Sequence, residues 1–505
     1  MSQKNIEAIY PLSPMQEGML FHTLSAPKSG GYFQQLCYTL HGAVDVSAFE
    51  RAWQRVVDRH PVLRTLFTLK GRDKPLQVVR RQVKLPWEHQ DWRGRSPNQQ
   101  QEQLASFLQA DRARGFELSR APLMCVSLIR LAEDAYQFIW SFHNMLLDGW
   151  SGPLISEEVF AFYEAFRQGE DRHLKPPRPY RDYIAWLQQQ DLSEAEMFWR
   201  QTLKGVTAPT TLKVAREKRE AESRDDSGLS PEHRYDKGQI ELSAATTAGL
   251  QSLAQAHRLT LNTLVQGAWA ILLSRYSREN DVVFGATVSG RSVPLEGVEN
   301  MVGLFINTLP VRVQVSPETS ILPWLKAFQA QQVEMRQYEY SPLVEIQGWS
   351  EVPRGQPLFE SIVVFENYPA KQKMDRSLEL RNVRVFEQTN YPLTVVTGPG
   401  PQLPLHIIYD CSRFDAPTIT RMLGHMRTLL EGIVANPEQQ LSALPLLTET
   451  ELHQLLVEWN KTLRDYPRDK YLHELFEVQA EQTPDAVSVV FEGDISYAVC
   501  CAGLL

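Results

Sequence analysis

Apolar residues at helical spacing alternate along the chain with short apolar runs that are typical of strands. Near the N-terminus, Phe49, Trp53 and Val56 recur every three or four positions, so they share one face of a helix. Residues 47–50, Ser-Ala-Phe-Glu, carry the capping-box pattern and predict where this helix begins. The run VLRTLF, residues 62–67, follows and favours a strand. We therefore expect a helix that leads into a strand.

A second pattern joins two strands to a helix. Residues 124–131 and 136–142 are rich in β-branched and aromatic side chains and are separated by a short polar stretch, which predicts a hairpin. Beyond it the apolar period becomes helical, at Ile155, Val159, Phe162 and Phe166. Asp148 lies between the hairpin and the helix. An acidic residue is favoured there as a helix N-cap, and the same position suits an active-site loop.

The second part of the chain repeats this plan. The proline-rich stretch at residues 174–183 marks a boundary. Residues 214–228 mix both charges with almost no large apolar side chain, which is typical of a solvated loop rather than a site. Thr260 is placed to cap a helix, and the run DVVFGATV, residues 281–288, predicts the strand after it. Two mixed α/β units of similar plan are therefore predicted.

Composition narrows the class of protein. The 505 residues are 43% hydrophobic and 22% charged, which is typical of a globular chain. A net charge of -8 argues against a broad nucleic-acid-binding surface. The sequence has no signal-peptide pattern and no run of about 18 apolar residues, so we expect a cytoplasmic protein without membrane contact. The cysteines lack metal-binding spacing and are expected to be reduced thiols: Cys37, Cys125, Cys411, Cys500 and Cys501.

Six short strings follow one another in order along the chain. They are LSPMQEGMLFHTL at 12–24, RHPVLRTLF at 59–67, FHNMLLDGWS at 142–151, YRDYIAW at 180–186, NMVGLFINTLPVRV at 300–313 and PLFESIVVFENYP at 357–369. With these strings the sequence resembles the condensation domain of nonribosomal peptide synthetases, a family related to chloramphenicol acetyltransferase. One string alone would be weak evidence. All six, in order over residues 8–447, are specific.

The resemblance implies an α/β (α+β) fold of two chloramphenicol-acetyltransferase-like lobes, arranged as a V-shaped pseudo-dimer with a central tunnel. Residues 1–175 would form the N-terminal lobe and residues 176–447 the C-terminal lobe. Residues 448–470 read as a linker. Residues 471–505 resemble the opening of an adenylation domain, a fragment that stops before that family's nucleotide-binding motifs.

The resemblance also implies a reaction and partners. The family joins a donor peptidyl or acyl thioester to the amine of an acceptor aminoacyl thioester, and both are held by 4'-phosphopantetheine on carrier proteins. The expected partners are an upstream donor carrier, a downstream acceptor carrier and the adjoining adenylation domain. We expect no cofactor or metal on this chain, no nucleic acid, no membrane, and a monomer.

The third signature departs from the family at its central residue. The family writes it HHxxxDG, so His143 matches the first histidine and Asn144 stands at the second. The second histidine handles the proton of the attacking amine or positions the amine. An asparagine amide hydrogen-bonds an amine but cannot take up its proton at neutral pH. Asn144 thus implies impaired chemistry, as a natural form or as an engineered variant.

The other site residues follow from the same resemblance. Asp148 would pair with Arg64 of the second signature as a buried structural brace, with a catalytic acid as the alternative. Gly149 would lie where the acceptor channel opens, although a glycine at a helix start is an equal alternative. Ser289 is a candidate hydrogen-bond donor near the reacting carbonyl, against an ordinary turn serine. Trp150 is a possible substrate contact.

Two finer readings remain open. The string MQEGMLFH in the first signature is similar to condensation domains that accept a donor ending in a D-residue, whereas the all-L subclass tends to carry a QKR-like string. A docking platform that binds carriers or a tailoring enzyme without catalysis is the alternative to an enzyme, and Asn144 favours it. An acetyltransferase that uses acetyl-coenzyme A fits the fold but not the second-half signatures.

Overall fold

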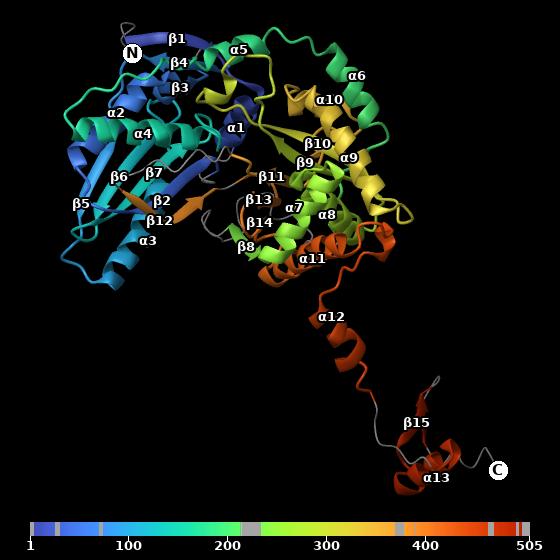
Figure 1. Ribbon diagram of the computed structural model, residues 1–505. Coiled ribbons are helices and arrows are strands. Elements are labelled where there is room, and N and C mark those ends of the chain that lie inside the picture. The colour runs from blue at the N-terminus through green and yellow to red at the C-terminus, as the bar shows by residue number, and fades with distance from the viewer. Residues whose placement is uncertain are drawn as a thin grey trace. The chain divides into compact units, whose positions relative to one another are not determined.

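The computed structural model of the chain describes residues 5–25, 31–69, 74–212, 214, 234–368, 378–387, 389–462, 469–490 and 494–496. The chain folds into two compact units, Met1–Leu446 and Leu447–Leu505. The first unit contains two mixed α/β halves, blue to cyan and green to orange in Figure 1. The predicted mixed α/β class is confirmed. The stretch predicted to be a solvated loop, residues 214–228, lies outside the described residues except for Val214.

The first half is built around a five-stranded sheet in the order β12-β2-β7-β6-β5. Its strands are β2 (Phe33–His41), β5 (Trp87–Asp91), β6 (Met124–Arg130), β7 (Ala135–His143) and β12 (Glu379–Phe386). Helices α2 (Val46–Arg59) and α4 (Ser151–Arg167) cover one face, where the rings of Trp53 and Phe138 stack 5.5 Å apart. Helix α3 (Pro97–Arg114) covers the other face, where Ile139 packs near Phe107. The hairpin predicted from residues 124–142 is confirmed as β6 and β7.

A smaller sheet and two helices complete this half. The sheet has the order β1-β4-β3, with β1 (Ile6–Pro11), β3 (Thr65–Thr68) and β4 (Leu76–Arg80). Helix α1 (Pro14–Ser25) follows β1, and α5 (Arg181–Leu187) contacts β1 from further along the chain. The small sheet thus brings the start of the chain beside the end of α2.

Two local predictions in this region are wrong. Helix α2 is capped by Asp45, whose Oδ1 accepts from the N–H of Ala48 at 2.9 Å, and not by a capping box at residues 47–50. A carboxylate just before the predicted cap is an equally good cap and also favours the helix N-terminus electrostatically. Residues Pro61–Arg64 form a 3₁₀ turn, so the strand begins only at Thr65. Proline has no N–H to donate to a sheet and its φ suits a helical turn.

The second half contains a six-stranded sheet in the order β10-β9-β11-β13-β14-β8. Its strands are β8 (Tyr235–Glu241), β9 (Asp281–Val288), β10 (Asn307–Gln314), β11 (Ser361–Phe365), β13 (Leu393–Thr397) and β14 (Pro404–Asp410). Its helices are α6 (Ser193–Thr202), α7 (Ala244–His257), α8 (Leu261–Ser277), α9 (Ile321–Arg336), α10 (Leu343–Trp349) and α11 (Ala416–Ala435). Thr260 caps α8, because its Oγ1 accepts from the N–H of Thr263 at 3.0 Å. The predicted helix and the strand after it are both confirmed.

One strand crosses between the halves. β12 comes from the second half of the sequence but pairs antiparallel with β2, from Glu379 opposite His41 to Phe386 opposite Gln35. It therefore forms the edge of the first half's sheet (Figure 1). The two halves share a ladder of backbone hydrogen bonds.

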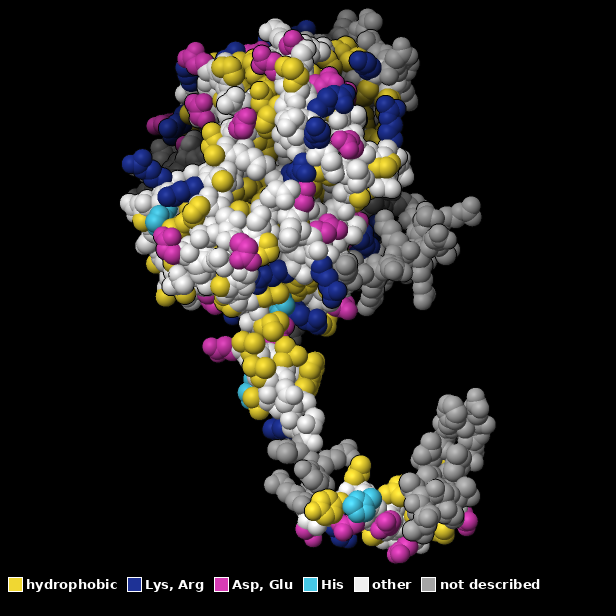
Figure 2. Space-filling view, turned by 90° about the vertical axis from the view of Figure 1, so that its right-hand side faces the viewer, with side chains coloured by type: hydrophobic (Ala, Val, Ile, Leu, Met, Phe, Trp, Pro, Cys, Tyr) yellow, Lys and Arg dark blue, Asp and Glu magenta, His cyan; other side chains and the backbone are white. Residues whose placement is uncertain are grey.

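The second unit contains little structure of its own. It comprises α12 (Glu449–His453), a π-helical turn (Gln454–Glu458), α13 (Leu472–Gln482) and the strand pair β15 (Val487–Val490) and β16 (Asp494–Ser496). Exposed apolar side chains cluster between residues 452 and 459 and form a yellow patch in Figure 2: Leu452, Leu455, Leu456, Val457 and Trp459. Such a cluster is typical of a surface that other polypeptide covers.

Candidate active site

His143 and Asn144 lie where β7 ends. His143 is the last residue of the strand and pairs with Phe33 of β2. The N–H of Asn144 then donates to the carbonyl of Tyr32 at 2.8 Å, which extends the ladder by one position. Gln16 of α1 donates to the carbonyl of Met145 at 2.8 Å and holds the turn that follows. The first and third signatures are therefore in contact.

His143 is buried and electrically neutral. Its Nδ1 accepts from the N–H of Met145 at 3.2 Å, which assigns the ring proton to Nε2. Burial lowers its pKa to about 4. Nε2 has no hydrogen-bond partner among the described residues, and neither has the buried Oδ1 of Asn144. The motif therefore presents one free donor and one free acceptor beside each other in the chain.

Asp148 joins the two halves of the first unit. Its oxygens accept from the N–H and the hydroxyl of Ser151 at 3.0 and 2.8 Å, and so reach the first turn of α4 as predicted. They also accept from the N–H of Phe305 at 3.0 Å. Nη2 of Arg291 lies 3.1 Å from both carboxylate oxygens. The residue is a buried structural brace.

The prediction that Arg64 is the partner of Asp148 is wrong. Arg64 ends the 3₁₀ turn beside β4, and there it binds Glu7 at 2.6 Å and the carbonyls of Arg80 and Arg81. Its Nε donates to the carbonyl of Val57. The Arg64 guanidinium binds groups next to it and stabilises the small sheet instead of contacting Asp148.

Arg291, the true partner, was not among the predicted residues. It follows β9 by three positions, and its Nη1 donates to the carbonyls of Val298 and Met301 at 2.7 and 2.8 Å. Its guanidinium carbon lies 4.0 Å from the ring centroid of Phe305. Burial lowers its pKa, while the charge of Asp148 opposes this shift. The one signal in the sequence that could have indicated Arg291 is a cation shortly after a buried strand.

Gly149 and Trp150 continue from the brace. Gly149 is exposed, and the hydroxyl of Tyr368 occupies the place that a Cβ at this position would take. A glycine is thus required for Tyr368, from the second half, to approach the motif. The indole N–H of Trp150 donates to the carbonyl of Glu299 at 2.9 Å. Trp150 is therefore held in place by the second half, and its contact with substrate stays a prediction.

Ser289 lies in the turn after β9. Its side chain is exposed, and its Oγ accepts from the N–H of Arg291 at 3.3 Å. This bond belongs to the turn that presents Arg291 to Asp148. The role of Ser289 beside a reacting carbonyl stays a prediction.

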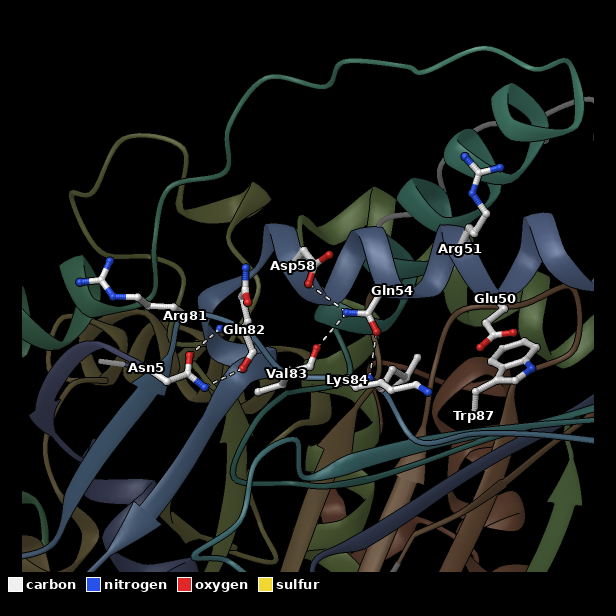
Figure 3. Close-up of a pocket in the computed structure, with 11 residues that line it drawn as sticks. Asn5, Glu50, Arg51, Gln54, Asp58, Arg81, Gln82, Val83, Lys84 and Trp87 are labelled. Carbon is white, nitrogen blue, oxygen red and sulfur yellow. Dashed lines mark hydrogen bonds between the residues drawn. The ribbon is translucent and has the colours of Figure 1, made fainter. Parts of the chain in front are cut away.

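A hollow of about 840 Å³ on the first half lies apart from these residues (Figure 3). Its lining polar groups bind one another: Gln54 donates to Asp58 at 2.9 Å and to the carbonyl of Val83 at 3.0 Å, and Asn5 exchanges two hydrogen bonds with Gln82. No residue of the third signature lines it. The hollow is a gap between α2 and the segment after β4 whose polar groups already bind one another, and we do not assign it as the candidate site.

The described parts of the chain contain neither a candidate metal site nor a candidate membrane-spanning helix. There, no three histidine, cysteine, aspartate or glutamate side chains gather as a metal site would require, and no helix has the length and apolar character to cross a bilayer. On the face in Figure 2, basic and acidic side chains are interspersed.

Comparisons with known proteins identify the family. The family described as "Condensation domain" matches residues 6–456. One of the linear gramicidin synthase proteins of Brevibacillus parabrevis is 47% identical over 499 residues, which are 98% of this chain and 6% of the relative. Bacitracin synthase 3 of Bacillus licheniformis is 38% identical over 491 residues, 96% of this chain and 8% of the relative. The chain thus spans only a small part of these relatives.

Solved structures share the fold. The X-domain solved in complex with OxyB from teicoplanin biosynthesis superposes with a TM-score of 0.72 at 23% identity, covering 87% of this chain and 96% of that one. The first condensation domain of the calcium-dependent antibiotic synthetase gives 0.71 at 17% identity, covering 88% and 100%. The fold is therefore the chloramphenicol-acetyltransferase-like fold of these structures. The chain belongs to the condensation-domain family of nonribosomal peptide synthetases.

Proposed function

We propose that this chain forms an amide bond between a donor peptidyl or acyl thioester and the amine of an acceptor aminoacyl thioester. Members of the family are acyl or peptidyl transferases that act on substrates tethered by phosphopantetheine to carrier proteins. The observation that supports the proposal is the intact brace of Asp148, four residues after Asn144, with Arg291. It holds the third signature at the junction of the halves, where a tunnel would bring two tethered substrates together.

Asn144 orients the acceptor amine in this proposal. Its Oδ1, which has no partner in the described part of the chain, accepts a hydrogen bond from the amine N–H, but the amide takes up no proton. His143 remains neutral at cellular pH, and its Nε2–H is available as a donor. If the histidine usual at position 144 acts as a general base, the Asn144 form is slower by about 10²- to 10⁴-fold. The loss is smaller if that histidine mainly positions the amine.

The test compares this chain with Asn144→His. A donor carrier loaded with a peptidyl group and an acceptor carrier loaded with an aminoacyl group are mixed, and amide product is followed over a single turnover. We expect slow product with Asn144 and faster product with histidine. Absence of product with both forms, although both carriers bind, would refute the proposal.

A docking platform is the second candidate. A fold of this kind was solved as a complex of the X-domain and OxyB, so the fold can present a surface to another protein. Asn144 supports this reading because it removes the family's usual histidine. The same assay separates the candidates, since a platform binds carriers or a tailoring enzyme and gives no turnover in either form.

Finer features belong to the same proposal. The string MQEGMLFH on α1 supports a donor ending in a D-residue, tested by loading matched D- and L-terminated donors. Residues 471–505 are assigned as the opening of an adenylation domain, residues 448–470 as the linker before it, and the chain as a cytoplasmic monomer that needs no cofactor. Light scattering of the purified chain tests the monomer.

A further inference from the structure

The edge strand β12 carries a glutamate to the junction of the halves. Phe386, the last residue of β12, is opposite Gln35 of β2, so Glu387 continues the register opposite Gln34. Gln34 is in turn opposite Phe142 of β7. Residues directly opposite one another share a face of an antiparallel sheet. Glu387, Gln34 and Phe142 therefore lie on one face.

Asn144 lies on this same face. It continues the β2–β7 register opposite Tyr32, one position beyond the pair of Phe33 and His143. With about 5 Å between strands and about 3.3 Å per residue, the Cα atoms of Asn144 and Glu387 are roughly 12 Å apart. Both side chains project from the same face of the sheet, so a group bound between them would lie over the β2 residues that separate the two strands.

The second half turns charged side chains toward this face. Lys237 of β8 is opposite Ile408 of β14, and His406 precedes Ile408 by two residues, so these side chains share a face. Gly238 faces the other way, toward α11, where a Cβ would lie 2.7 Å from Cγ2 of Ile419. Lys237 and His406 are therefore turned away from the helices of their own half.

Glu366 connects these groups with the third signature. It follows β11, and its N–H donates to the carbonyl of Thr397 at 2.7 Å. The hydroxyl of Tyr368 donates to its Oε1 at 3.4 Å, and the same hydroxyl lies against Gly149. One side chain thus separates the Glu366 carboxylate from the loop that carries Asp148.

The Glu366 carboxylate acts electrostatically on that of Glu387, and Lys237 is a cation that interacts with both. Burial, and next the negative charge of Glu366, raise the pKa of Glu387 to about 7, while the Gln34 hydrogen bond and Lys237 lower it. Burial also raises the pKa of Glu366. Burial lowers the pKa of Lys237, against the charges of both carboxylates. With two carboxylates and one ammonium, these three side chains carry a net negative charge when Glu387 is ionised.

The neighbouring titratable groups leave this charge in place. Burial, and next Lys237, lower the pKa of His406 to about 4, so this imidazole is neutral. Arg112 of α3 lies over the ring of Phe386 at 4.6 Å, on the opposite face of the sheet. The charge of Asp148 is already met by its brace.

Two buried atoms of the third signature have no partner among the described residues. Oδ1 of Asn144 accepts no hydrogen bond, and Nε2 of His143 donates none, although the His143 residue is only 4% exposed. Because successive residues of a strand face opposite sides of the sheet, only the Asn144 oxygen is on the face of Glu387. Unpaired buried polar atoms are rare, and at a candidate site they are positions that a water or a ligand would fill. An amine N–H is the donor that the asparagine oxygen requires.

We propose that Glu366 and Glu387 bind the protonated α-amino group of the acceptor, and that Glu387 takes its proton before attack. This inference rests on the proposed amide-forming function. The ammonium gives one proton to the Glu387 carboxylate, and the neutral amine forms the N–C bond with the thioester carbon. The C–S bond breaks with its electron pair on sulfur, and the second amine proton goes to that thiolate. Glu387 then returns its proton to solvent.

A binding experiment tests the site without requiring turnover. The probe is a stable amide analogue of glycyl-pantetheine, and the matched ligand is its N-acetylated form, which carries no ammonium. At pH 8 we expect the amine form to bind about 10-fold or more tightly than the acetylated form. The preference should weaken toward pH 6 as Glu387 gains a proton. In Glu366→Gln/Glu387→Gln it should fall to about 1, and a retained preference would overturn the proposal.

Kinetics test the proton transfer. In Glu387→Gln we expect single-turnover condensation to lose the rise with pH that is centred near 7. Glu379→Gln is the matched control, because it removes an exposed carboxylate from the other end of β12. It should keep both the rate and the pH profile. An unchanged profile in Glu387→Gln would overturn the inference while leaving the amide-forming function intact, and equal melting temperatures exclude a folding defect.

Discussion

Asp148 and Arg291 meet as a buried ion pair, 3.1 Å apart, although 143 positions separate them in the sequence. Their side chains are 0% and 3% exposed. One comes from the turn before α4 and the other from the turn after β9, so the pair ties the third signature to the second half. Charges this deeply buried are costly unless both partners are present.

Removing one partner of this pair should destabilise the first unit severely. We expect Arg291→Met to lower the free energy of unfolding by about 3–5 kcal/mol, because it leaves the Asp148 carboxylate buried without its cation. Asp148→Asn combined with Arg291→Met should lose less than the sum of the single changes. Urea unfolding of the four forms measures this coupling, and strict additivity would contradict the brace.

Arg64 provides the comparison. Because Arg64 binds Glu7 and shares no contact with Asp148, the losses in Arg64→Met and Asp148→Asn should add within roughly 0.5 kcal/mol. A large coupling between these two positions would restore the prediction made from the sequence.

Gly149→Ala should disturb Tyr368 rather than the fold. The new methyl group takes the place of the Tyr368 hydroxyl, so that the ring must move away from the motif. We expect slower condensation with a melting temperature close to the original. Tyr368→Ala in the same chain should relieve the clash and recover part of the rate. Tyr368→Phe in the Gly149→Ala chain should recover no rate, because the phenyl ring still lies against the new methyl group.

Stability should depend on pH through Glu387. Its pKa rises from 4.5 to about 7 on folding, so its stabilising contribution is complete below pH 4.5 and is lost as the pH rises through 7. Between pH 5 and pH 8 the original chain should therefore lose stability relative to Glu387→Gln. Denaturant midpoints at both values measure this. A constant difference would show that the carboxyl group is not shifted.

Asn144→His should add an ionisable group at the motif. Its rate should rise with pH through an apparent pKa of about 6.5, the ordinary value for imidazole. Single-turnover rates from about pH 5.5 to about pH 8.5 bracket that value and follow the change. Both this variant and its control, Asn144→Gln, are measured in the Glu387→Gln background, which removes the rise centred near 7. There Asn144→Gln keeps an amide and should show no rise with pH.

The periodic parts of the fold could be predicted from the sequence. Thr260 with its helix, and the hairpin that ends at His143, have local signals that later packing did not override. The cap of α2 shows the limit, because Asp45 and Ser47 are both acceptable caps and the choice between them is decided by the approach of the chain.

The site could be predicted only as far as the signature itself. The position of Asn144 follows from its spacing to Asp148, but partners drawn from distant segments leave no local mark. Arg64 and Arg291 are both cations beside a buried strand, and only the packing of the halves selects Arg291. Glu387 is brought to the face of the proposed amine site by the pairing of β12 with β2, and no periodicity in the sequence predicts this pairing.

Because β12 pairs with β2 in the first half's sheet, neither half is expected to fold alone. A fragment that ended before residue 379 would present β2 as a bare edge, with a row of backbone donors and acceptors open to other chains. We therefore expect each half to aggregate when it is expressed without the other. Exchange of the whole unit Met1–Leu446 between proteins would keep the pairing of β12 with β2, whereas exchange of one half alone would break it.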